Sequence, residues 1–376
     1  MEQKIITASD HYAQLDAWLA GIGAKKILLV CDGSIRFMAA FNAHLDELRA
    51  KGLVFVPFSD FQPNPHYDSV VAGVKLLRAE RCDALMAVGG GSAMDVAKCI
   101  KAYCGMDGDG CDGGFLRQKI VPNDIPFLAM PTTAGTGSEA TRYAVIYYEG
   151  AKQSVTSESF IPGTVLMDSG VLKTLPVYQK KATMMDALCH AIESYWSVNS
   201  TEESKKYSRA AIQGVLGHLE GYLSNTDEGN AGMLLAAHTA GKAINITQTT
   251  AGHAMCYKIT SLFGCAHGHA AILCDRVLFP WMIAHTAETI DPRGADDLKA
   301  TLDEIGTAMG CADARGGAEK LERLFRSLEL EVPAADEEQL CMLRTSVNPD
   351  RLKNHPVRLT EETIDALYRS ILGKKQ

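Results

Sequence analysis

The first 175 residues alternate short apolar runs with stretches of helical spacing. The runs are KKILLVCDG (25–33), LVFVPF (53–58), DALMAVGGG (83–91), IPFLAMPTT (125–133) and TVLMDSG (164–170). Each ends in turn residues, and several lead into an amphipathic stretch such as HYDSVVAGVKLLRAERC. Because buried strands that alternate with helices pair through crossover connections, this order predicts a parallel sheet of βαβ units. RYAVIYYEGAKQSVTS is different and indicates an antiparallel hairpin that turns at Glu149–Gly150.

The strand pattern stops after Pro176. QKKATMMDALCHAIESYWSV, EESKKYSRAAIQGVLGHLEGYL and GNAGMLLAAHTAGKAINIT have the spacing and length of helices, as does the tail from residue 290. The sequence therefore predicts an α/β domain over residues 1–175 and an all-helical domain over residues 176–376. The cleft between two such domains is the expected place for an active site.

Composition narrows the function. A net charge of −8 argues against a nucleic-acid partner, because phosphate binding needs a basic face. No apolar run approaches the roughly 18 to 20 residues that span a bilayer. The segment MEQKIITASDHYAQ lacks the apolar stretch of a signal peptide, and the 11 cysteines include no CxxC pair. These features predict reduced thiols and a cytoplasmic protein without a membrane partner.

The segment ALMAVGGGSAMDVAK runs from a predicted strand through three glycines and a serine into a helix. Glycines let a backbone approach a phosphate closely, and the helix start offers free N–H groups to an anion. The loop differs from the GxGxxG fingerprint because Met94 stands at the third glycine, and no Gly-Lys-Ser/Thr follows as in a P-loop. The pattern favours a phosphate site over a tight turn that binds nothing.

A second strand end, MPTTAGTGSEAT, supports a dinucleotide crevice because it is rich in hydroxyl groups and glycine. Thr132, Thr133, Thr136 and Ser138 are its candidate ligands. Asp32 closes the strand LLVCD, where a carboxylate can accept hydrogen bonds from ribose hydroxyls and would repel a 2′-phosphate. NAD(H) is therefore favoured over NADP(H), although capping of the next turn is the alternative role for Asp32.

The segment MMDALCHAIES places Asp186 and His190 four residues apart on one helical face. The later segment GHAMCYKITSLFGCAHGHA adds His253, His267 and His269. One carboxylate with imidazoles suits Fe²⁺, Zn²⁺, Ni²⁺ or Mn²⁺, and a buried carboxylate needs a partner. Spacing alone does not rank His267 over His269.

Three cysteines, Cys189, Cys256 and Cys265, lie near these residues in the sequence. Thiolates bind metals, but a free cysteine is more commonly a small buried apolar residue. We therefore interpret the three as packing residues.

Five segments together resemble the iron-containing (group III) alcohol dehydrogenases. They are PNP (63–65), AVGGGSAMDVAK, MPTTAGTGSEAT, MDALCHAIES and HAMCYKITSLFGCAHGHA, in the order of that family. The resemblance implies a Rossmann-like dinucleotide-binding domain followed by a helical metal-binding domain, the arrangement also found in dehydroquinate synthase. It further implies hydride transfer between a small alcohol and an aldehyde, Fe²⁺ before Zn²⁺ as the metal, and a homodimer.

The resemblance also assigns residues. The implied metal ligands are Asp186, His190, His253 and His267, so His269 is not a ligand in that pattern. The implied cofactor-binding residues are Asp32, Asn64, Gly90, Gly91, Ser92, Asp95, Thr132, Thr133 and Ser138. Tyr257 stands where many members have a second histidine near the nicotinamide; a tyrosine can donate a proton, although its ordinary pKa is near 10.

Two phrases, AINITQTTAGHAMCYKITSLFGCAHGHA and ESYWSVNSTEESKKYSRAAI, resemble a subgroup that reduces phosphonoacetaldehyde to 2-hydroxyethylphosphonate. A phosphonate needs Arg or Lys, so Arg142 and Lys258 are the candidate substrate-binding residues, ahead of Lys152. The alternatives are a general short-chain alcohol dehydrogenase, a dehydroquinate synthase-like lyase without net redox change, and a nucleotide-binding protein without catalysis.

Overall fold

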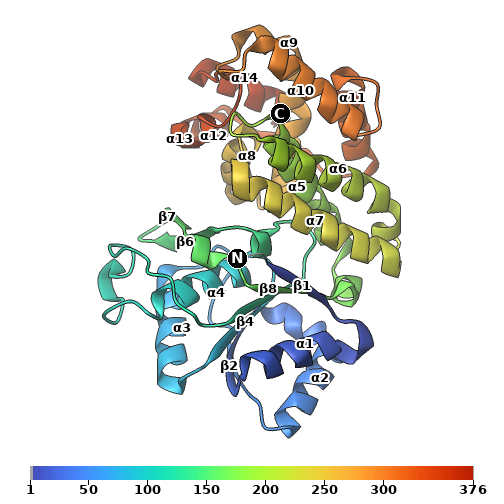
Figure 1. Ribbon diagram of the computed structural model, residues 1–376. Helices are drawn as coiled ribbons and strands as arrows, with labels where there is room; N and C mark the ends of the chain where they lie inside the picture. The colour runs from blue at the N-terminus through green and yellow to red at the C-terminus, as the bar shows by residue number, and fades with distance from the viewer. Residues whose placement is uncertain (1–2, 376) are drawn as a thin grey trace. The chain divides into compact units, whose positions relative to one another are not determined.

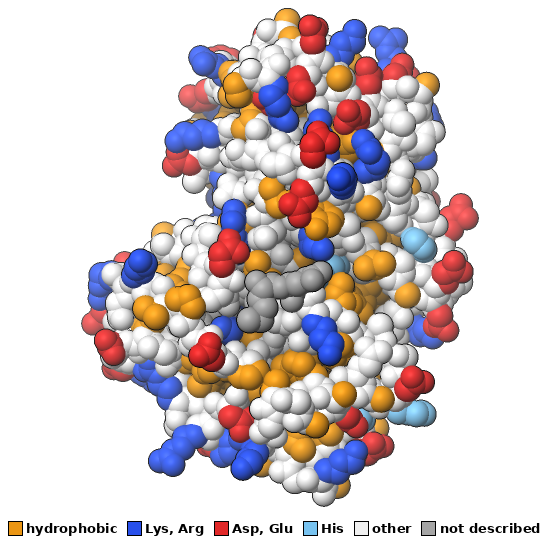
Figure 2. All heavy atoms as spheres, viewed as in Figure 1, with side chains coloured by type: hydrophobic (Ala, Val, Ile, Leu, Met, Phe, Trp, Pro, Cys, Tyr) orange, Lys and Arg blue, Asp and Glu red, His pale blue; other side chains and the backbone are white. Residues whose placement is uncertain are grey.

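The computed structural model describes residues 3–375. The chain divides into two compact units, one of Met1–Thr133 with Gly137–Leu175 and one of Ala134–Thr136 with Pro176–Gln376. None of the described helices is both long and apolar enough to cross a membrane. On the face drawn in Figure 2, basic and acidic side chains are interspersed.

A six-stranded parallel sheet forms the first unit, with the strand order β1-β8-β5-β4-β2-β3. Its strands are β1 (Lys4–Thr7), β2 (Lys26–Cys31), β3 (Val54–Phe58), β4 (Ala84–Gly89), β5 (Phe127–Pro131) and β8 (Thr164–Met167). The helices are α1 (Ser9–Ile22), α2 (Ala39–Ala50), α3 (Tyr67–Glu80) and α4 (Gly91–Tyr103). The five predicted strands and the parallel order are confirmed, whereas β1 was not predicted.

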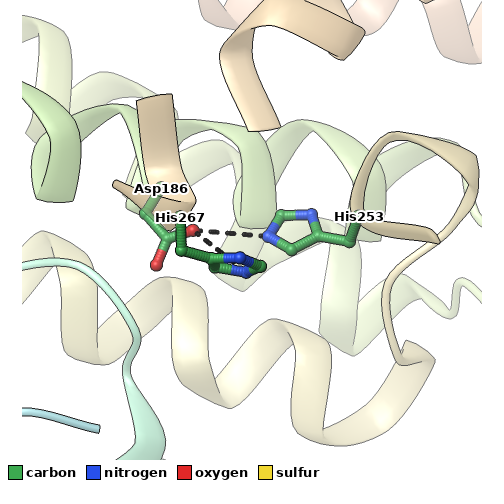
Figure 3. A group of neighbouring side chains, drawn as sticks. All are labelled: Asp186, His253 and His267. Atoms are coloured by element: carbon green, nitrogen blue, oxygen red, sulfur yellow. Dashed lines mark hydrogen bonds and ion pairs between the residues drawn. The ribbon is translucent and has the colours of Figure 1, made fainter. Parts of the chain in front are cut away.

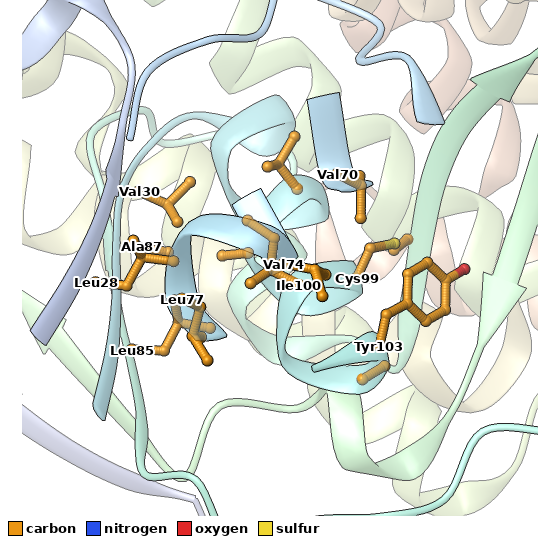
Figure 4. Packing of buried hydrophobic residues seen from close by; sticks show 14 of the residues in the cluster. Leu28, Val30, Val70, Val74, Leu77, Leu85, Ala87, Cys99, Ile100 and Tyr103 are labelled. Carbon is orange, nitrogen blue, oxygen red and sulfur yellow. The ribbon is translucent and has the colours of Figure 1, made fainter. Parts of the chain in front are cut away.

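Both faces of the sheet are covered, which is why its inner strands β8, β5, β4 and β2 are almost entirely buried and mostly apolar. On one face, apolar side chains of β2 and β4 pack against apolar side chains of α3 and α4 (Figure 4). The strand residues are Leu28, Val30, Leu85 and Ala87, and the helix residues are Val70, Val74, Leu77 and Ile100. Helices α1 and α2 lie on the opposite side of the sheet (Figure 1). Because β2, β4 and β5 are adjacent and parallel, their carboxyl ends meet at one edge of the sheet. The glycine loop and the hydroxyl-rich loop predicted to bind the cofactor begin at this edge.

The predicted hairpin is present as β6 (Tyr143–Tyr148) and β7 (Ala151–Thr156). The two strands pair antiparallel, and the pairing of Tyr148 with Ala151 places the turn at Glu149–Gly150 as expected.

The second unit is built of helices. They are α5 (Val177–Trp196), α6 (Glu202–Leu223), α7 (Asp227–Thr247), α8 (Ala251–Phe263), α9 (His267–Ala284), α10 (Ala295–Ala308), α11 (Ala314–Ser327), α12 (Glu337–Ser346), α13 (Pro349–Leu352) and α14 (Glu361–Ile371). One difference from the all-helical prediction is a two-residue parallel pair, β9 (Ala334–Ala335) with β10 (Gly373–Lys374).

Helix α5 lies at the centre of this unit. Every residue from Met184 to Trp196 is buried, so this part of the helix has no solvated face. A helix buried all round is expected to be apolar, and each charged group within it needs a partner. The acidic and basic side chains of α5 are therefore the first place to look for a site.

Candidate metal centre and nucleotide loop

Three ionisable side chains follow one another along α5. Asp186, His190 and Glu193 are all buried, with at most 6% of each residue exposed. Their spacing of four and three residues places them along one face of the helix. Asp186 and His190 were predicted from the sequence, whereas Glu193 was not, although its spacing of three residues from His190 was visible.

Helices α8 and α9 bring the other two histidines to this face. His253 lies in the first turn of α8, and His267 is the first residue of α9. A glycine adjoins each of them. A Cβ on Gly252 would lie 1.9 Å from Oδ1 of Asp275, and a Cβ on Gly268 would lie 2.1 Å from the carbonyl oxygen of Ala182. The absence of a side chain at these two positions is what lets the histidine-bearing turns approach so closely.

The structure brings Asp186, His253 and His267 together (Figure 3). One potential ligand atom from each lies within 4.8 Å of the others. Nε2 of His253 is 3.4 Å from Oδ1 of Asp186, and Nε2 of His267 is 3.9 Å from the same oxygen. The His190 ring stacks on that of His253, with the ring centroids 4.4 Å apart. Three of the four predicted ligands thus form one group, and His190 lies beside that group through its contact with His253.

Glu193 contacts His253 on the Nδ1 side of the ring, opposite the Nε2 atom that faces Asp186. One carboxylate oxygen contacts Nδ1 of His253 and accepts the backbone N–H of His253 at 3.0 Å. The other oxygen accepts the backbone N–H and the hydroxyl of Thr250, both at 2.6 Å. A carboxylate at Nδ1 fixes the tautomer of an imidazole and leaves Nε2 to bind a metal, the arrangement common around metal-bound histidines.

The electrostatics of the group favour a positive charge. Burial opposes ionisation of Asp186, but the nearby His190, His253 and His267 together hold its pKa below the ordinary value. For His253, the carboxylates of Glu193 and Asp186 overcome the effect of burial and raise the pKa to about 10. Burial lowers the pKa of His190 to about 4, so this ring is neutral near pH 7 and offers a lone pair. Two carboxylates around these imidazoles can be balanced by a proton or by a metal cation.

These donors fit a divalent first-row metal. The set combines one carboxylate with neutral or deprotonatable imidazoles, and the Nδ1 atom of His190 is buried without a hydrogen-bond partner among the described residues. Oxygen and imidazole ligands suit Fe²⁺ and Zn²⁺ alike.

His269 is engaged elsewhere. Its Nδ1 lies 3.0 Å from the hydroxyl of Tyr178, and its Nε2 lies 2.8 Å from the carbonyl oxygen of Glu331. Both ring nitrogens are thereby occupied, so the structure separates His267 from His269, which spacing alone does not. Of the cysteines, Cys189 and Cys256 are buried; Sγ of Cys256 lies 3.6 Å from Nδ1 of His267.

Tyr257 borders the group on the same side of α8 as His253. Its ring stacks on His267, with the centroids 5.3 Å apart. Burial raises the pKa of Tyr257 above the ordinary value, although the charge of Arg351 opposes this. The phenol therefore keeps its proton near pH 7. Lys258 is one residue further along and is turned by about 100° from Tyr257 around the helix axis.

In the first unit, Asp32 is tied to the glycine loop. Its carboxylate accepts the backbone N–H of Ser34 at 2.8 Å and that of Gly90 at 3.1 Å. A second hydrogen bond joins the hydroxyl-rich loop to the glycine loop, because the backbone N–H of Thr132 donates to the carbonyl oxygen of Gly89 at 3.0 Å. Asp32 thus caps the following turn, which is the alternative role considered above, and it also fixes the glycine loop.

A hollow of about 750 Å³ opens beside these residues. Its lining includes the predicted Asp32, Gly90, Gly91 and Ser92, and also Arg36, Ser59, Gln62 and Pro63. Helix α4 begins at Gly91, so its free N–H groups lie at this hollow, as a phosphate site requires. Asn64 lies next to this lining and is exposed.

Other predicted cofactor residues belong to a buried network. Asp95 accepts the Ser138 hydroxyl at 3.0 Å and the backbone N–H of Val145 at 3.0 Å. Lys98 is fully buried and donates to the carbonyl and hydroxyl oxygens of Ser138 at 2.6 and 2.9 Å. Burial lowers the pKa of Lys98 to about 8. This network holds the hydroxyl-rich loop against α4, whereas Thr133 lies beside Gly90.

Arg142, a predicted substrate residue, is part of the first unit. Its guanidinium forms an ion pair with Glu158 at 2.7 Å, and its Nε donates to the Tyr143 hydroxyl at 3.1 Å. The hydrogen bond to Glu158, followed by that to Tyr143, raises the pKa of Arg142. An anionic ligand would have to compete with Glu158 for this arginine.

Comparison with known proteins places the chain in a family. Residues 2–169 match the iron-containing alcohol dehydrogenase family, and residues 180–372 match the C-terminal part of the Fe-containing alcohol dehydrogenase family. The chain belongs to the iron-containing alcohol dehydrogenase family and is an oxidoreductase of that class. The resemblance inferred from the sequence motifs is thereby confirmed.

Particular relatives extend this result. The phosphonoacetaldehyde reductase of Streptomyces viridochromogenes is 32% identical over 314 residues, which cover 80% of this chain and 79% of that protein. Long-chain-alcohol dehydrogenase 1 of Geobacillus thermodenitrificans is 28% identical, covering 93% and 90%. The crystal structure of a sulfoacetaldehyde reductase from Bifidobacterium kashiwanohense in complex with NAD⁺ has a TM-score of 0.87 at 25% identity, covering 99% and 98%.

His267→Ala and His269→Ala test the ligand assignment as a matched pair two residues apart. Mutation of a residue that only supports a metal ligand typically weakens metal binding roughly 10- to 100-fold. We expect His267→Ala to weaken metal binding by more than this, because it removes a ligand. His269→Ala leaves partners of a buried ring unpaired and costs about 1–3 kcal/mol of stability, but keeps the metal. Metal content after reconstitution with Fe²⁺ and a thermal melt measure the two effects. A full metal complement in His267→Ala would refute its role.

Glu193→Gln tests the group behind His253. The substitution keeps the size of the side chain and removes the charge that favours a cation, so we expect metal affinity to fall about 10- to 100-fold. Titration of metal-free protein with Zn²⁺ measures it. Glu304→Gln is the control, since Glu304 of α10 accepts a hydrogen bond from Tyr195, which lies on α5 like Glu193. Equal affinity in the two variants would show that Glu193 only supports the fold.

Asp32→Asn and Asp32→Ser test the cofactor preference. Asparagine keeps the size of the side chain and one acceptor oxygen, so it removes the charge but can accept only one of the N–H groups of Ser34 and Gly90. Loss of a like charge near a 2′-phosphate should raise the ratio of kcat/KM for NADPH to that for NADH about tenfold. An unchanged ratio in Asp32→Asn would show that the carboxylate does not face the ribose.

Proposed function

We propose that this protein is a metal-dependent NAD(H) aldehyde reductase that converts phosphonoacetaldehyde to 2-hydroxyethylphosphonate. The observation that carries the metal-dependent part is the buried group of Asp186, His253 and His267, with Glu193 behind His253. The substrate rests on the 32% identity to a phosphonoacetaldehyde reductase over 80% of the chain.

Each part of the site has a role in this proposal. Asp186, His190, His253 and His267 hold a divalent metal, with Fe²⁺ preferred to Zn²⁺. The hollow at Asp32, Gly90, Gly91 and Ser92 binds the cofactor. When bound, the metal supplies a Lewis acid for a carbonyl oxygen, and the nicotinamide supplies the hydride.

The chain itself contributes positioning and hydrogen bonding. Glu193 orients His253. Tyr257, which keeps its proton near pH 7, donates a hydrogen bond to the substrate oxygen and stands in the proton path to the product. Since its pKa lies above the ordinary value, Tyr257 is a donor rather than a general base.

NADH oxidation by metal-loaded enzyme tests the proposal. The aldehydes to compare are phosphonoacetaldehyde, sulfoacetaldehyde, propanal and lactaldehyde. We expect kcat/KM for phosphonoacetaldehyde to exceed that for the neutral aldehydes at least about 100-fold, equivalent to about 2.7 kcal/mol of transition-state stabilisation. Preference for propanal or lactaldehyde would identify a short-chain alcohol dehydrogenase instead. Failure of every aldehyde to consume NADH would favour the lyase.

A further inference from the structure

Arg351, which was not predicted from the sequence as a site residue, contacts Tyr257, whose ring stacks on the predicted metal ligand His267. Nη1 of Arg351 donates to the hydroxyl of Tyr257 at 3.1 Å. The guanidinium carbon also lies 5.1 Å from the centroid of the Tyr257 ring, which in turn stacks on His267. Arg351 therefore contacts a tyrosine that itself contacts a predicted metal ligand, although it comes from a different helix of the second unit.

Arg351 has a guanidinium with unused donors. Among residues 3–375 no carboxylate lies within ion-pair distance of it, and its side chain makes one hydrogen bond, to Tyr257. The neighbouring Asp350 pairs with Lys353 instead, at 2.5 Å. Two other arginines of the second unit are neutralised: Arg344 pairs with Asp365, and Arg369 pairs with Glu337. An arginine has five N–H groups in a planar fork, so Arg351 can still bind an oxyanion through two of them.

The backbone around Arg351 is anchored, so the guanidinium is held in place before a ligand arrives. Arg351 belongs to α13, which packs beside α8 (Figure 1). Three residues later, Asn354 donates to Gln248 at 3.0 Å and to the carbonyl of Thr249 at 3.2 Å, in the turn just before α8. The backbone N–H of Val198 donates to the carbonyl of Asn354 at 3.1 Å. These bonds connect the segment to both α5 and α8.

The two basic residues predicted from the sequence fit this role less well. Arg142 is already paired with Glu158. Lys258 follows Tyr257 by one residue and points about 100° away from it around α8. Arg351, in contrast, contacts Tyr257 directly and is half-buried, which strengthens its interaction with an anion relative to a fully exposed charge.

We propose that Arg351, held against Tyr257, binds the tetrahedral oxyanion group of the substrate. This inference rests on the proposed function for the reaction and adds the residue that selects an anionic aldehyde over a neutral one. A phosphonate and a sulfonate share this chemistry, because each presents oxygens to a planar guanidinium.

Arg351→Ala, with Arg358→Ala as the control, tests the proposal. Arg358 is an exposed arginine seven residues away, so its removal changes the net charge equally. In Arg351→Ala we expect kcat/KM for phosphonoacetaldehyde to fall about 10- to 150-fold, mainly through KM, as for loss of hydrogen bonds to a charged group. For propanal we expect a smaller fall than for phosphonoacetaldehyde, because a neutral aldehyde loses only the effect of the hydrogen bond from Arg351 to Tyr257. Metal content should equal that of the wild type, and Arg351→Lys should recover part of the loss. Sulfoacetaldehyde, run in parallel, shows which oxyanion is preferred.

A second measurement separates this inference from the substrate assignment. Ethylphosphonate carries the anion without an aldehyde, and we expect it to inhibit propanal reduction by the wild type and by Arg358→Ala, but far less by Arg351→Ala. That result supports the anion site even if phosphonoacetaldehyde proves a poor substrate. Efficient phosphonoacetaldehyde turnover that is unchanged in Arg351→Ala overturns the role of Arg351 and leaves the proposed function intact. Absence of inhibition in the wild type also overturns it.

Discussion

A carboxylate in the interior of a buried helix is the constraint on which the second unit depends. Asp186 is 2% exposed within a helix that has no solvated face from Met184 onward. An isolated charge there would cost far more than the few kcal/mol of net stability of a domain. His253, whose pKa is raised, and the His267 ring are therefore required neighbours, because both lie beside the Asp186 carboxylate. Glu193, seven residues later, is a second buried carboxylate of the same helix, and it accepts hydrogen bonds from His253 and Thr250.

This electrostatic arrangement needs unusually close helices. Gly252 and Gly268, beside His253 and His267, remove the Cβ atoms that would collide with Asp275 and with the backbone of α5. The predicted ligands His253 and His267 and the glycines that allow the backbones to approach are thus adjacent in the chain. A larger residue at either glycine would separate the helices and break the group, although it touches no ligand atom.

Local patterns predicted most of the fold, and long-range contacts account for what they missed. The inner strands β2, β4, β5 and β8 are buried along almost their whole length and form continuous apolar runs. The edge strand β3 is also an apolar run, whereas the other edge strand, β1, is four residues long with one buried side chain. Asp186 and His190 were visible as an i, i+4 pair. Glu193 resembled an ordinary helical glutamate, since its partner His253 is 60 residues away. Arg351 is 94 residues from Tyr257, and no spacing rule connects two segments at such a separation.

In the proposed function, the position of Arg351 separates reactivity from substrate choice within one unit. The predicted metal ligands come from α5, α8 and α9, which are fixed by burial and by close backbone contacts. Arg351 comes from a four-residue helix that is connected to them through Tyr257 and the hydrogen bonds of Asn354. Among the described residues, Arg351 itself makes no ion pair or hydrogen bond to a predicted ligand, and its side-chain hydrogen bond goes to Tyr257. A change at Arg351 can therefore alter which aldehyde is bound while the ligand helices keep their geometry, so one metal site can serve charged and neutral substrates.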